Sequence, residues 1–389
     1  MYMKIKIFLL LAFFYVANSN AQKLIDTIAV KSGVFDIPIK ILLPKNMTKS
    51  KMPVYFFVHG GGWNGGTQDK VPPATLPSDA PFISNQLGVI YVGLAYRCKG
   101  NIATFADAIN DLKASVKWFM DNSEMFNADV TRIGFGGASA GSTLAAIMAQ
   151  KYQNSRLFVG LEGMYNLVDH DPEKSSFPNK EGRELYGLST KKQSKRASAF
   201  YNLRKKPPTT LLFNGKEDAL CHFSQTENFA NKIKTSGGKV KIILYENINH
   251  TCLNPSYPEV MKKSVLEIAN LFIEEFQLKN TDLNAIESLL NQKLHGMTKK
   301  NTINQVDILG SWKLNNITIN FYEDGKGTFV NSKNNIVKEF LFSLEQDTIL
   351  CDFNGETRSF FMRENNKMIY EINLVDRDLK YRAFNYTKT

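Results

Sequence analysis

The chain has 389 residues, of which 43% are hydrophobic and 22% are charged, and its formal net charge is +11. This globular balance excludes a long disordered protein, and the length allows two or three domains with a sizeable core. Only four cysteines are present, which excludes a disulfide scaffold, and their spacing matches no zinc motif.

Residues 1–21 are predicted to be a secretory signal peptide. Lysines in MYMKIK precede an apolar run that is too short to span a bilayer, and Ser19 and Ala21 supply small residues before Gln22. We therefore expect an exported protein, periplasmic or secreted. No later segment is apolar enough to predict a transmembrane helix.

Strands and helices alternate through the next part of the chain. Residues 24–30 and 37–44 alternate in polarity like an antiparallel strand pair. Continuous apolar runs predict strands buried on both faces at 54–59, 88–97 and 132–137. Further strands are predicted at 157–163, 209–215 and 240–247. Apolar residues at helical spacing predict helices at 106–122, 143–152, 226–238 and 260–278. This order predicts an α/β fold, a mostly parallel sheet with helices on both faces.

The composition changes towards the C-terminus. Residues 279–305 are polar and contain one short amphipathic piece, which predicts a linker helix. Residues 306–389 hold many short alternating runs separated by turn signals such as EDGKG, which predicts a small all-β barrel or sandwich. The expected domains are therefore a signal peptide (1–21), an α/β domain (22–278), the linker (279–305) and an all-β domain (306–389).

A nucleophile motif follows the strand at 132–137. Residues 137–141 read GASAG, a G-x-S-x-G pentad between a predicted strand and a predicted helix. In that context a sharp turn lifts the serine hydroxyl above the sheet. The helix start behind Ser139 also favours developing negative charge. Ser139 is therefore the candidate nucleophile.

A serine nucleophile needs a base, and an acid to orient that base. In this arrangement the order along the chain is serine, acid, histidine. His250 follows the strand at 240–247 directly and is the candidate base among five histidines. The loop after the strand at 209–215 supplies Asp218 as the candidate acid, with Glu217 as the alternative.

A glycine-rich loop, HGGGW, follows the strand at 54–59. Such a loop supplies backbone N–H groups for an oxyanion hole, where side chains would block the approach of the substrate. We assign the hole to Gly61, Gly62 and the N–H of Ala140. Trp63 is predicted to form a wall of the acyl pocket.

HGGGW, AYR at 95–97, RIGFGGASAG, PP-x-x-LLFNG-x-x-D at 207–218 and the final NH at 249–250 together resemble the carboxylesterases of the α/β-hydrolase superfamily. The likeness covers roughly residues 25–278. It is greatest to bacterial feruloyl and acetyl-xylan esterases and their hormone-sensitive-lipase-like relatives. Asn214-Gly215 departs from the His-Gly that is usual there. Separately, Gly310-Ser311-Trp312 is similar to the start of lipocalin-like domains.

The resemblance implies an exported serine esterase that acts on small-molecule esters or esterified oligosaccharides, such as acetyl or feruloyl esters of polysaccharides. It implies no metal and no cofactor. Two alternatives stay open: an amidase or peptidase of the same fold, and a non-catalytic binding protein that uses the β domain. Fluorophosphonate labelling of Ser139 would separate the last of these from an enzyme.

Two further features are a pair of cysteines and a basic stretch. Cys221 and Cys252 closely follow Asp218 and His250, so neighbouring loops would allow a disulfide between them in an oxidising compartment. The stretch 180–206 holds nine Lys or Arg and two Glu, a local charge of +7. We interpret it as a solvated basic face, with attraction of acidic glycans as the alternative. Nucleic acid is not an expected partner, because the chain carries no nucleic-acid motif.

Overall fold

The computed structural model describes residues 23–48, 50–64, 80–98, 103–250, 258–279, 281–298, 305–314, 316–345, 348–354, 357–363, 368–372 and 383–388. The predicted signal peptide lies outside these residues. The chain forms two compact units. The first comprises Met1–Asn254 and Lys263–Ile286, and the second comprises Pro255–Lys262 and Glu287–Thr389. The predicted linker 279–305 contains α8 (Leu283–Thr298), and the boundary between the units falls within this helix.

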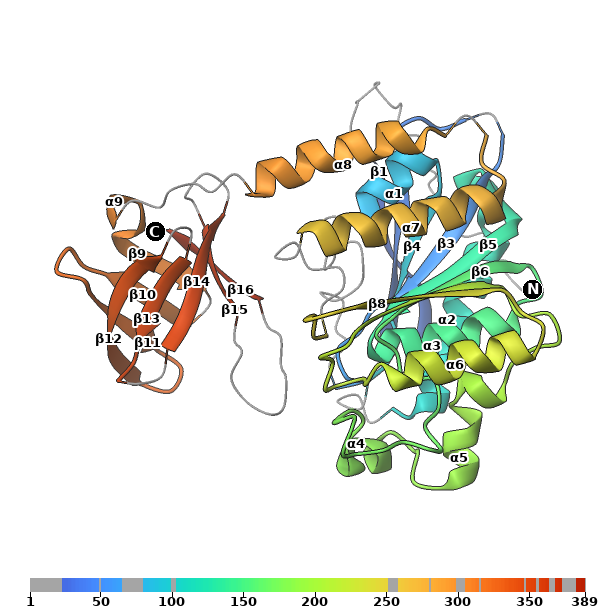
Figure 1. The fold of residues 1–389 in the computed structure, drawn as a ribbon, viewed down its shortest axis with the longest axis horizontal. Coiled ribbons are helices and arrows are strands. Elements are labelled where there is room, and N and C mark those ends of the chain that lie inside the picture. The colour runs from blue at the N-terminus through green and yellow to red at the C-terminus, as the bar shows by residue number, and fades with distance from the viewer. Residues whose placement is uncertain are drawn as a thin grey trace, which may run out of the picture. The chain divides into compact units, whose positions relative to one another are not determined.

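An eight-stranded sheet, in the order β1-β2-β4-β3-β5-β6-β7-β8, forms the centre of the first unit (Figure 1). Its strands are β1 (Lys23–Ser32), β2 (Phe35–Leu43), β3 (Met52–Val58), β4 (Ile90–Leu94), β5 (Ala128–Ala138), β6 (Ser155–Leu161), β7 (Thr209–Gly215) and β8 (Val240–Tyr245). β1 pairs with β2 and β2 with β4 in antiparallel fashion, whereas the six strands from β4 to β8 in the sheet order run parallel. The predicted mostly parallel α/β sheet is confirmed.

Helices cover both faces of this sheet. Figure 1 shows α1 (Ala80–Leu87) and α7 (Pro258–Phe276) on one face, and α2 (Phe105–Asp121), α3 (Ala140–Lys151) and α6 (Ser224–Thr235) on the other. α3 is buried on all sides between strands and neighbouring helices, which explains why its residues are apolar and small almost throughout. Short helical pieces occupy the connections: η3 (Ser123–Phe126), α4 (Lys180–Leu185), α5 (Lys191–Arg196) and η4 (Ala199–Tyr201).

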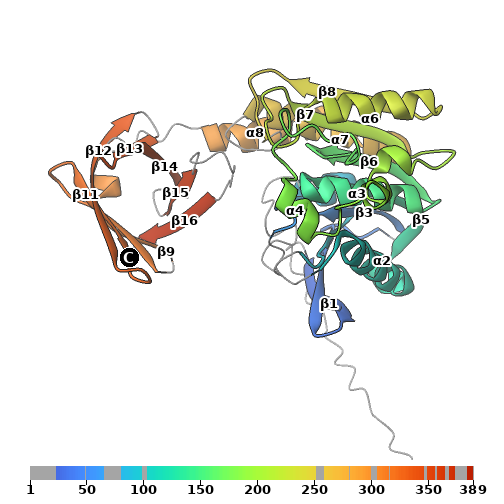
Figure 2. The same cartoon turned by 90° about the horizontal axis from the view of Figure 1, so that it is seen from below.

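The second unit contains a closed antiparallel barrel (Figure 2). Its strands are β9 (Gly310–Leu314), β10 (Ile317–Phe321), β11 (Lys326–Asn331), β12 (Ile336–Glu345), β13 (Thr348–Asp352), β14 (Thr357–Arg363), β15 (Met368–Ile372) and β16 (Ala383–Lys388). β9 was not predicted as a strand, yet it closes the barrel by pairing with both β10 and β16. The predicted small all-β domain is thus confirmed as a barrel.

Trp312 belongs to the hydrophobic core of the barrel. Its side chain is fully buried, and its Nε1 donates a hydrogen bond of 2.7 Å to the carbonyl of Ile308 in α9 (Gln305–Ile308). Aromatic side chains from three strands and a turn belong to the same cluster: Phe321, Phe329, Phe340 and Phe353.

Among the residues that the structure describes in both units, no helix is long and apolar enough to cross a membrane.

Candidate active site

Ser139 occupies a strained turn between β5 and α3. Its backbone has φ 54° and ψ −125°, a combination that a residue with a side chain rarely adopts. Its N–H donates to the carbonyl of Leu161 at the end of β6, and its carbonyl accepts from Ser142 in the first turn of α3. The turn is therefore held from both sides, and it raises the side chain above the carboxyl end of the sheet.

The helix behind Ser139 approaches β3 so closely that no side chain fits between them. A Cβ on Gly141 would lie 2.2 Å from the carbonyl oxygens of Val58 and His59. A Cβ on Gly60 would lie 2.9 Å from the carbonyl oxygen of Ala138 and 3.3 Å from the Cβ of Ser139. The glycines of the two motifs thus bring the HGGGW loop directly against the serine turn.

The HGGGW loop turns sharply after Gly60. Gly61, Gly62 and Trp63 all have positive φ, at 115°, 61° and 55°. The side chain of Trp63 is only 1% exposed, and its Nε1 donates a hydrogen bond of 3.1 Å to the carbonyl of Ala140. Trp63 therefore fastens the loop to the start of α3, a role that was not predicted. Its part as a pocket wall stays a prediction.

Aromatic rings enclose Trp63. It stacks on Tyr186 at 5.0 Å between ring centroids and meets Phe105 and Phe177 at 5.6 Å and 4.8 Å. These contacts come from α2 and from the segment around α4. They fix the indole, and with it the backbone that was assigned to the oxyanion hole.

The candidate base and acid lie in contact. Nδ1 of His250, after β8, is 2.7 Å from Oδ2 of Asp218, after β7. The alternative acid, Glu217, is exposed. Nε2 of His250 is buried and has no hydrogen-bond partner among the described residues. An imidazole held in this way has one nitrogen committed to the acid and the other available for a proton.

Asn214, the last residue but one of β7, holds the acid in place. Its Nδ2 donates to Oδ2 of Asp218 at 3.1 Å and to the carbonyl of Cys221 at 3.0 Å. Its Oδ1 accepts from the hydroxyl of Thr226 at 2.7 Å. The backbone N–H groups of Leu220 and Cys221 donate to the other carboxylate oxygen of Asp218. The departure from the usual His-Gly therefore places an amide donor beside the acid.

A second carboxylate lies near the base. Oε2 of Glu162, directly after β6, is 3.9 Å from Nδ1 of His250. Burial lowers the pKa of His250, but the charges of Asp218 and Glu162 and the hydrogen bond to Asp218 outweigh burial, so the pKa rises to about 9. Glu162 was not predicted as a site residue. A lone charged residue at the end of the apolar run 157–163 is the signal that could have identified it.

Another histidine near the serine has a structural role. His59 is 3% exposed and stacks on Tyr96 at 4.5 Å, and the Tyr96 hydroxyl donates to its carbonyl. His59 also precedes Ser139 in the chain, which does not fit the order serine, acid, histidine. The predicted disulfide lies partly outside the described residues: Cys252 is not described, and Cys221 is a buried free cysteine.

The basic stretch 180–206 forms α4, α5 and the segments around them. Arg183 and Arg204 are half-buried and donate to backbone carbonyls, including those of Leu167 and Ser155. The other seven basic residues of the nine are exposed. The stretch is therefore a mixture of two structural arginines and a solvated basic surface.

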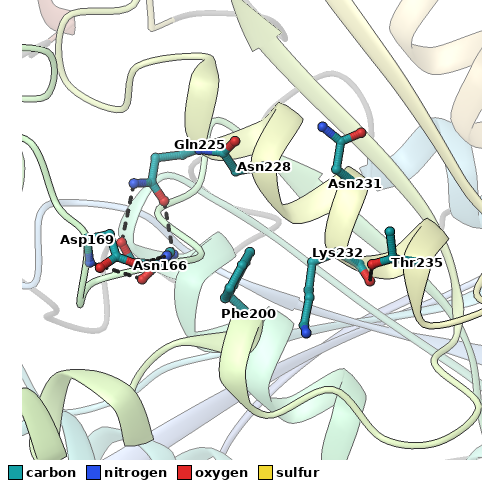
Figure 3. A pocket seen from close by; sticks show the side chains of 8 residues that line it. All are labelled: Asn166, Asp169, Phe200, Gln225, Asn228, Asn231, Lys232 and Thr235. Carbon is teal, nitrogen blue, oxygen red and sulfur yellow. Dashed lines mark hydrogen bonds between the residues drawn. The ribbon is translucent and has the colours of Figure 1, made fainter.

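One pocket in the first unit is lined by none of Ser139, Asp218 and His250 (Figure 3). Its lining is polar except for Phe200, and it includes Asn166, Asp169 and Gln225. The side-chain amide of Gln225 accepts a hydrogen bond from the N–H of Asn166 and donates one to the carbonyl of Asn166. The Nδ2 of Asn166 donates to Oδ2 of Asp169 at 2.8 Å. Among the described residues, no group of three or more His, Cys, Asp or Glu side chains could hold a metal ion.

The sheet order, the strained serine turn and the histidine and acid after the last two strands define an α/β-hydrolase. The chain belongs to the BD-FAE family, whose model matches residues 39–233. The esterase Est2 of Thermogutta terrifontis has the same fold, with a TM-score of 0.56 at 20% identity over 66% of this chain and 93% of that chain.

Two curated relatives match over shorter spans. Arylacetamide deacetylase of Bos taurus is 35% identical over 129 residues, 32% of this chain and 31% of that protein. Carboxylesterase NlhH of Mycobacterium tuberculosis is 31% identical over 118 residues, 30% of this chain and 35% of that protein. The chain thus spans about a third of the length of these relatives.

Proposed function

We propose that this protein is an exported serine esterase that hydrolyses carboxylic esters through an acyl-enzyme. The observation that carries the proposal is the 2.7 Å contact between His250 and Asp218, with Nε2 of the histidine left without a partner among the described residues. Ser139 Oγ would attack the ester carbonyl while Nε2 takes its proton. Asp218 keeps the remaining proton on Nδ1 and stabilises the imidazolium.

The negative charge on the carbonyl oxygen would be met by backbone N–H groups of Gly61, Gly62 and Ala140. Water then attacks the acyl-enzyme, with His250 as the base, and releases the acid. No step needs a metal or a cofactor. Est2 has been solved with propionate and with butyrate bound, which supports short acyl groups for this chain as well. Acetyl and feruloyl esters of polysaccharides are the proposed substrates, since the chain belongs to the BD-FAE family and carries a predicted signal peptide.

Hydrolysis of nitrophenyl acetate by the purified protein tests the chemistry. We expect Ser139→Ala and His250→Ala each to lower kcat by about 10⁵–10⁶, and the double variant to be no worse, because the two groups act as a unit. If His250→Ala keeps more than about a tenth of the activity, another group is the base. Release of acetate or ferulate from a panel of esterified oligosaccharides then tests the substrate class.

Amide hydrolysis is the second candidate, and the likeness to arylacetamide deacetylase favours it. A matched pair, an aryl acetate and the corresponding aryl acetamide, separates the two activities. An esterase shows a burst and turnover on the acetate alone. Comparable kcat/KM values on the amide would make the protein an amidase.

A further inference from the structure

Glu162 lies in an unusual position for a charged residue. It follows β6 directly, is 5% exposed, and has a positive φ of 53°. A residue with a side chain keeps this backbone conformation only when its surroundings hold it there. Its N–H donates a hydrogen bond of 2.9 Å to the carbonyl of Phe213 in β7.

The residues after Glu162 are bound to the helix of the nucleophile. The N–H of Met164 donates to Oγ1 of Thr143 at 3.2 Å, and the hydroxyl of Tyr165 lies 2.9 Å from Oγ of Ser142. Both partners belong to the first turn of α3, directly after Ser139. The segment that carries Glu162 is therefore tied to the same turn that carries the nucleophile.

A second helix holds the same segment from the other side. Gln225 of α6 accepts hydrogen bonds from the N–H groups of Tyr165 and Asn166 at 3.3 Å and 2.9 Å, and donates to the carbonyl of Asn166 at 3.3 Å. Figure 3 shows the amide of Gln225 directed at Asn166. With α3 and α6 both attached, the backbone beyond Glu162 has little freedom, and the carboxylate is held near the base.

The carboxylates of Asp218 and Glu162 lie at different distances from Nδ1 of His250 and therefore have different roles. Nδ1 of His250 carries one hydrogen, and Asp218 accepts it at 2.7 Å, whereas Glu162 lies at 3.9 Å from the same nitrogen. The side chains of His250, Glu162 and Asp218 are 9%, 7% and 0% exposed, so water screens their charges weakly. Glu162 therefore acts on the imidazole through its charge.

Other titratable groups near this cluster stay neutral at neutral pH. Burial, followed by the charges of Asp218 and Glu162, raises the pKa of the Cys221 thiol well above its usual value. Burial likewise raises the pKa of the Tyr165 hydroxyl, and the charge of Glu162 raises it further. Among the described residues, the charges that face His250 are thus those of Asp218 and Glu162.

We propose that Glu162 is a positioning residue of the site, a second carboxylate that stabilises the imidazolium form of His250 together with Asp218. This inference rests on the proposed role of His250 as the base. The imidazolium forms when Ser139 gives up its proton, so a fixed negative charge beside it lowers the energy of that step. The same charge raises the pH at which free His250 loses its proton and becomes a base.

The test compares pH profiles of kcat/KM for nitrophenyl acetate hydrolysis. Glu162→Gln keeps the size of the side chain and removes the charge, so we expect the rising limb to move down by about one to two pH units. Glu162→Asp keeps the charge and should retain most of the wild-type position. Glu246→Gln is the matched control, because Glu246 is an exposed carboxylate that pairs with Lys216. Its profile should coincide with that of the wild type.

A second measurement does not depend on turnover. In ¹⁵N-labelled protein carrying Ser139→Ala, the imidazole signals of His250 report its titration directly, and Glu162→Gln should lower the midpoint by the same amount. An unmoved midpoint and an unmoved limb would overturn the proposal, as would a uniform loss of activity at every pH with the midpoint unchanged. If the Ser139→Ala variant hydrolyses the ester as well as the wild type does, the proposed function itself fails.

Discussion

At the scale of single residues, the raised pKa of His250 gives activity and stability opposite dependences on pH. The imidazole must be neutral to accept the proton of Ser139, and its pKa in the folded protein rises to about 9. We therefore expect kcat/KM to increase from pH 7 towards pH 9. Stability follows the other sign: the folded pKa lies above the ordinary value of about 6.5, so the stabilisation is complete below about pH 6.5 and is lost as the pH rises through 9.

Thermal melts between pH 6 and pH 10, alongside pH profiles of hydrolysis, measure both effects. His250→Gln is the control, because its side chain does not titrate, and its Tm should fall less steeply than that of the wild type over this window. A wild-type Tm that rises between pH 7 and pH 10 relative to the control would contradict the charge cluster described here.

The sequence predicted the residues that follow recognisable strands and did not predict their supporting partners. Ser139 follows β5 directly, and Asp218 and His250 lie in the loops after β7 and β8. The structure brings His250 and Asp218 together. Asn214 and Glu162 were not predicted as site residues, although each lies at the end of an apolar run. Which side chains meet there depends on how neighbouring strands are aligned, and that alignment is a property of the folded sheet.

At the scale of elements, the join between β5 and α3 depends on the absence of one side chain. The carbonyls of Val58 and His59 occupy the space where a Cβ of Gly141 would lie. Backbone atoms cannot rotate away, so Gly141→Ala must push α3 off the end of β3. We expect a destabilisation of about 3 kcal/mol or more, together with loss of ester hydrolysis.

Gly33→Ala is the comparison for this prediction. Gly33 has a φ of +62°, and no atom lies within 4 Å of the position that a Cβ would take. The alanine therefore destabilises the fold only through its left-handed backbone conformation, by about 1–2 kcal/mol. Urea unfolding measures the free energy of unfolding of each variant. Hydrolysis of nitrophenyl acetate by the folded proteins measures the activity of each. A Gly141→Ala protein as stable and active as Gly33→Ala would show that the turn can open without harm.

Elements differ in how far the sequence predicts them. β3, β4 and residues 133–137 of β5 were found because they are buried and read as continuous apolar runs, whereas β8 is only partly buried. β9 was missed because it begins with Gly310-Ser311, residues typical of turns, so that only three residues are left to show an alternation. The short helices α4 and α5 were missed for a similar reason, since six residues carry little periodicity and their capping residues, Asn179 and Thr190, are also typical of loops.

At the scale of the whole molecule, each unit has a hydrophobic core of its own. One cluster includes the sheet and its helices, and another lies inside the barrel around Trp312. Every residue assigned to the triad and the oxyanion hole belongs to the first unit. We therefore expect two thermal transitions, and ester hydrolysis that follows only one of them.

Trp312→Ala tests this separation in the full chain. Trp312 is fully buried and donates to Ile308, so its truncation should cost the barrel about 3–5 kcal/mol and lower one transition by many degrees. The temperature of the other transition should not change, and the kcat/KM for nitrophenyl acetate at 25 °C should stay within about twofold of the wild-type value, since the two units have separate hydrophobic cores. Calorimetry paired with initial rates gives both readouts. A single cooperative transition that moves with Trp312→Ala and takes the activity with it would show that the hydrolase depends on the barrel for its stability.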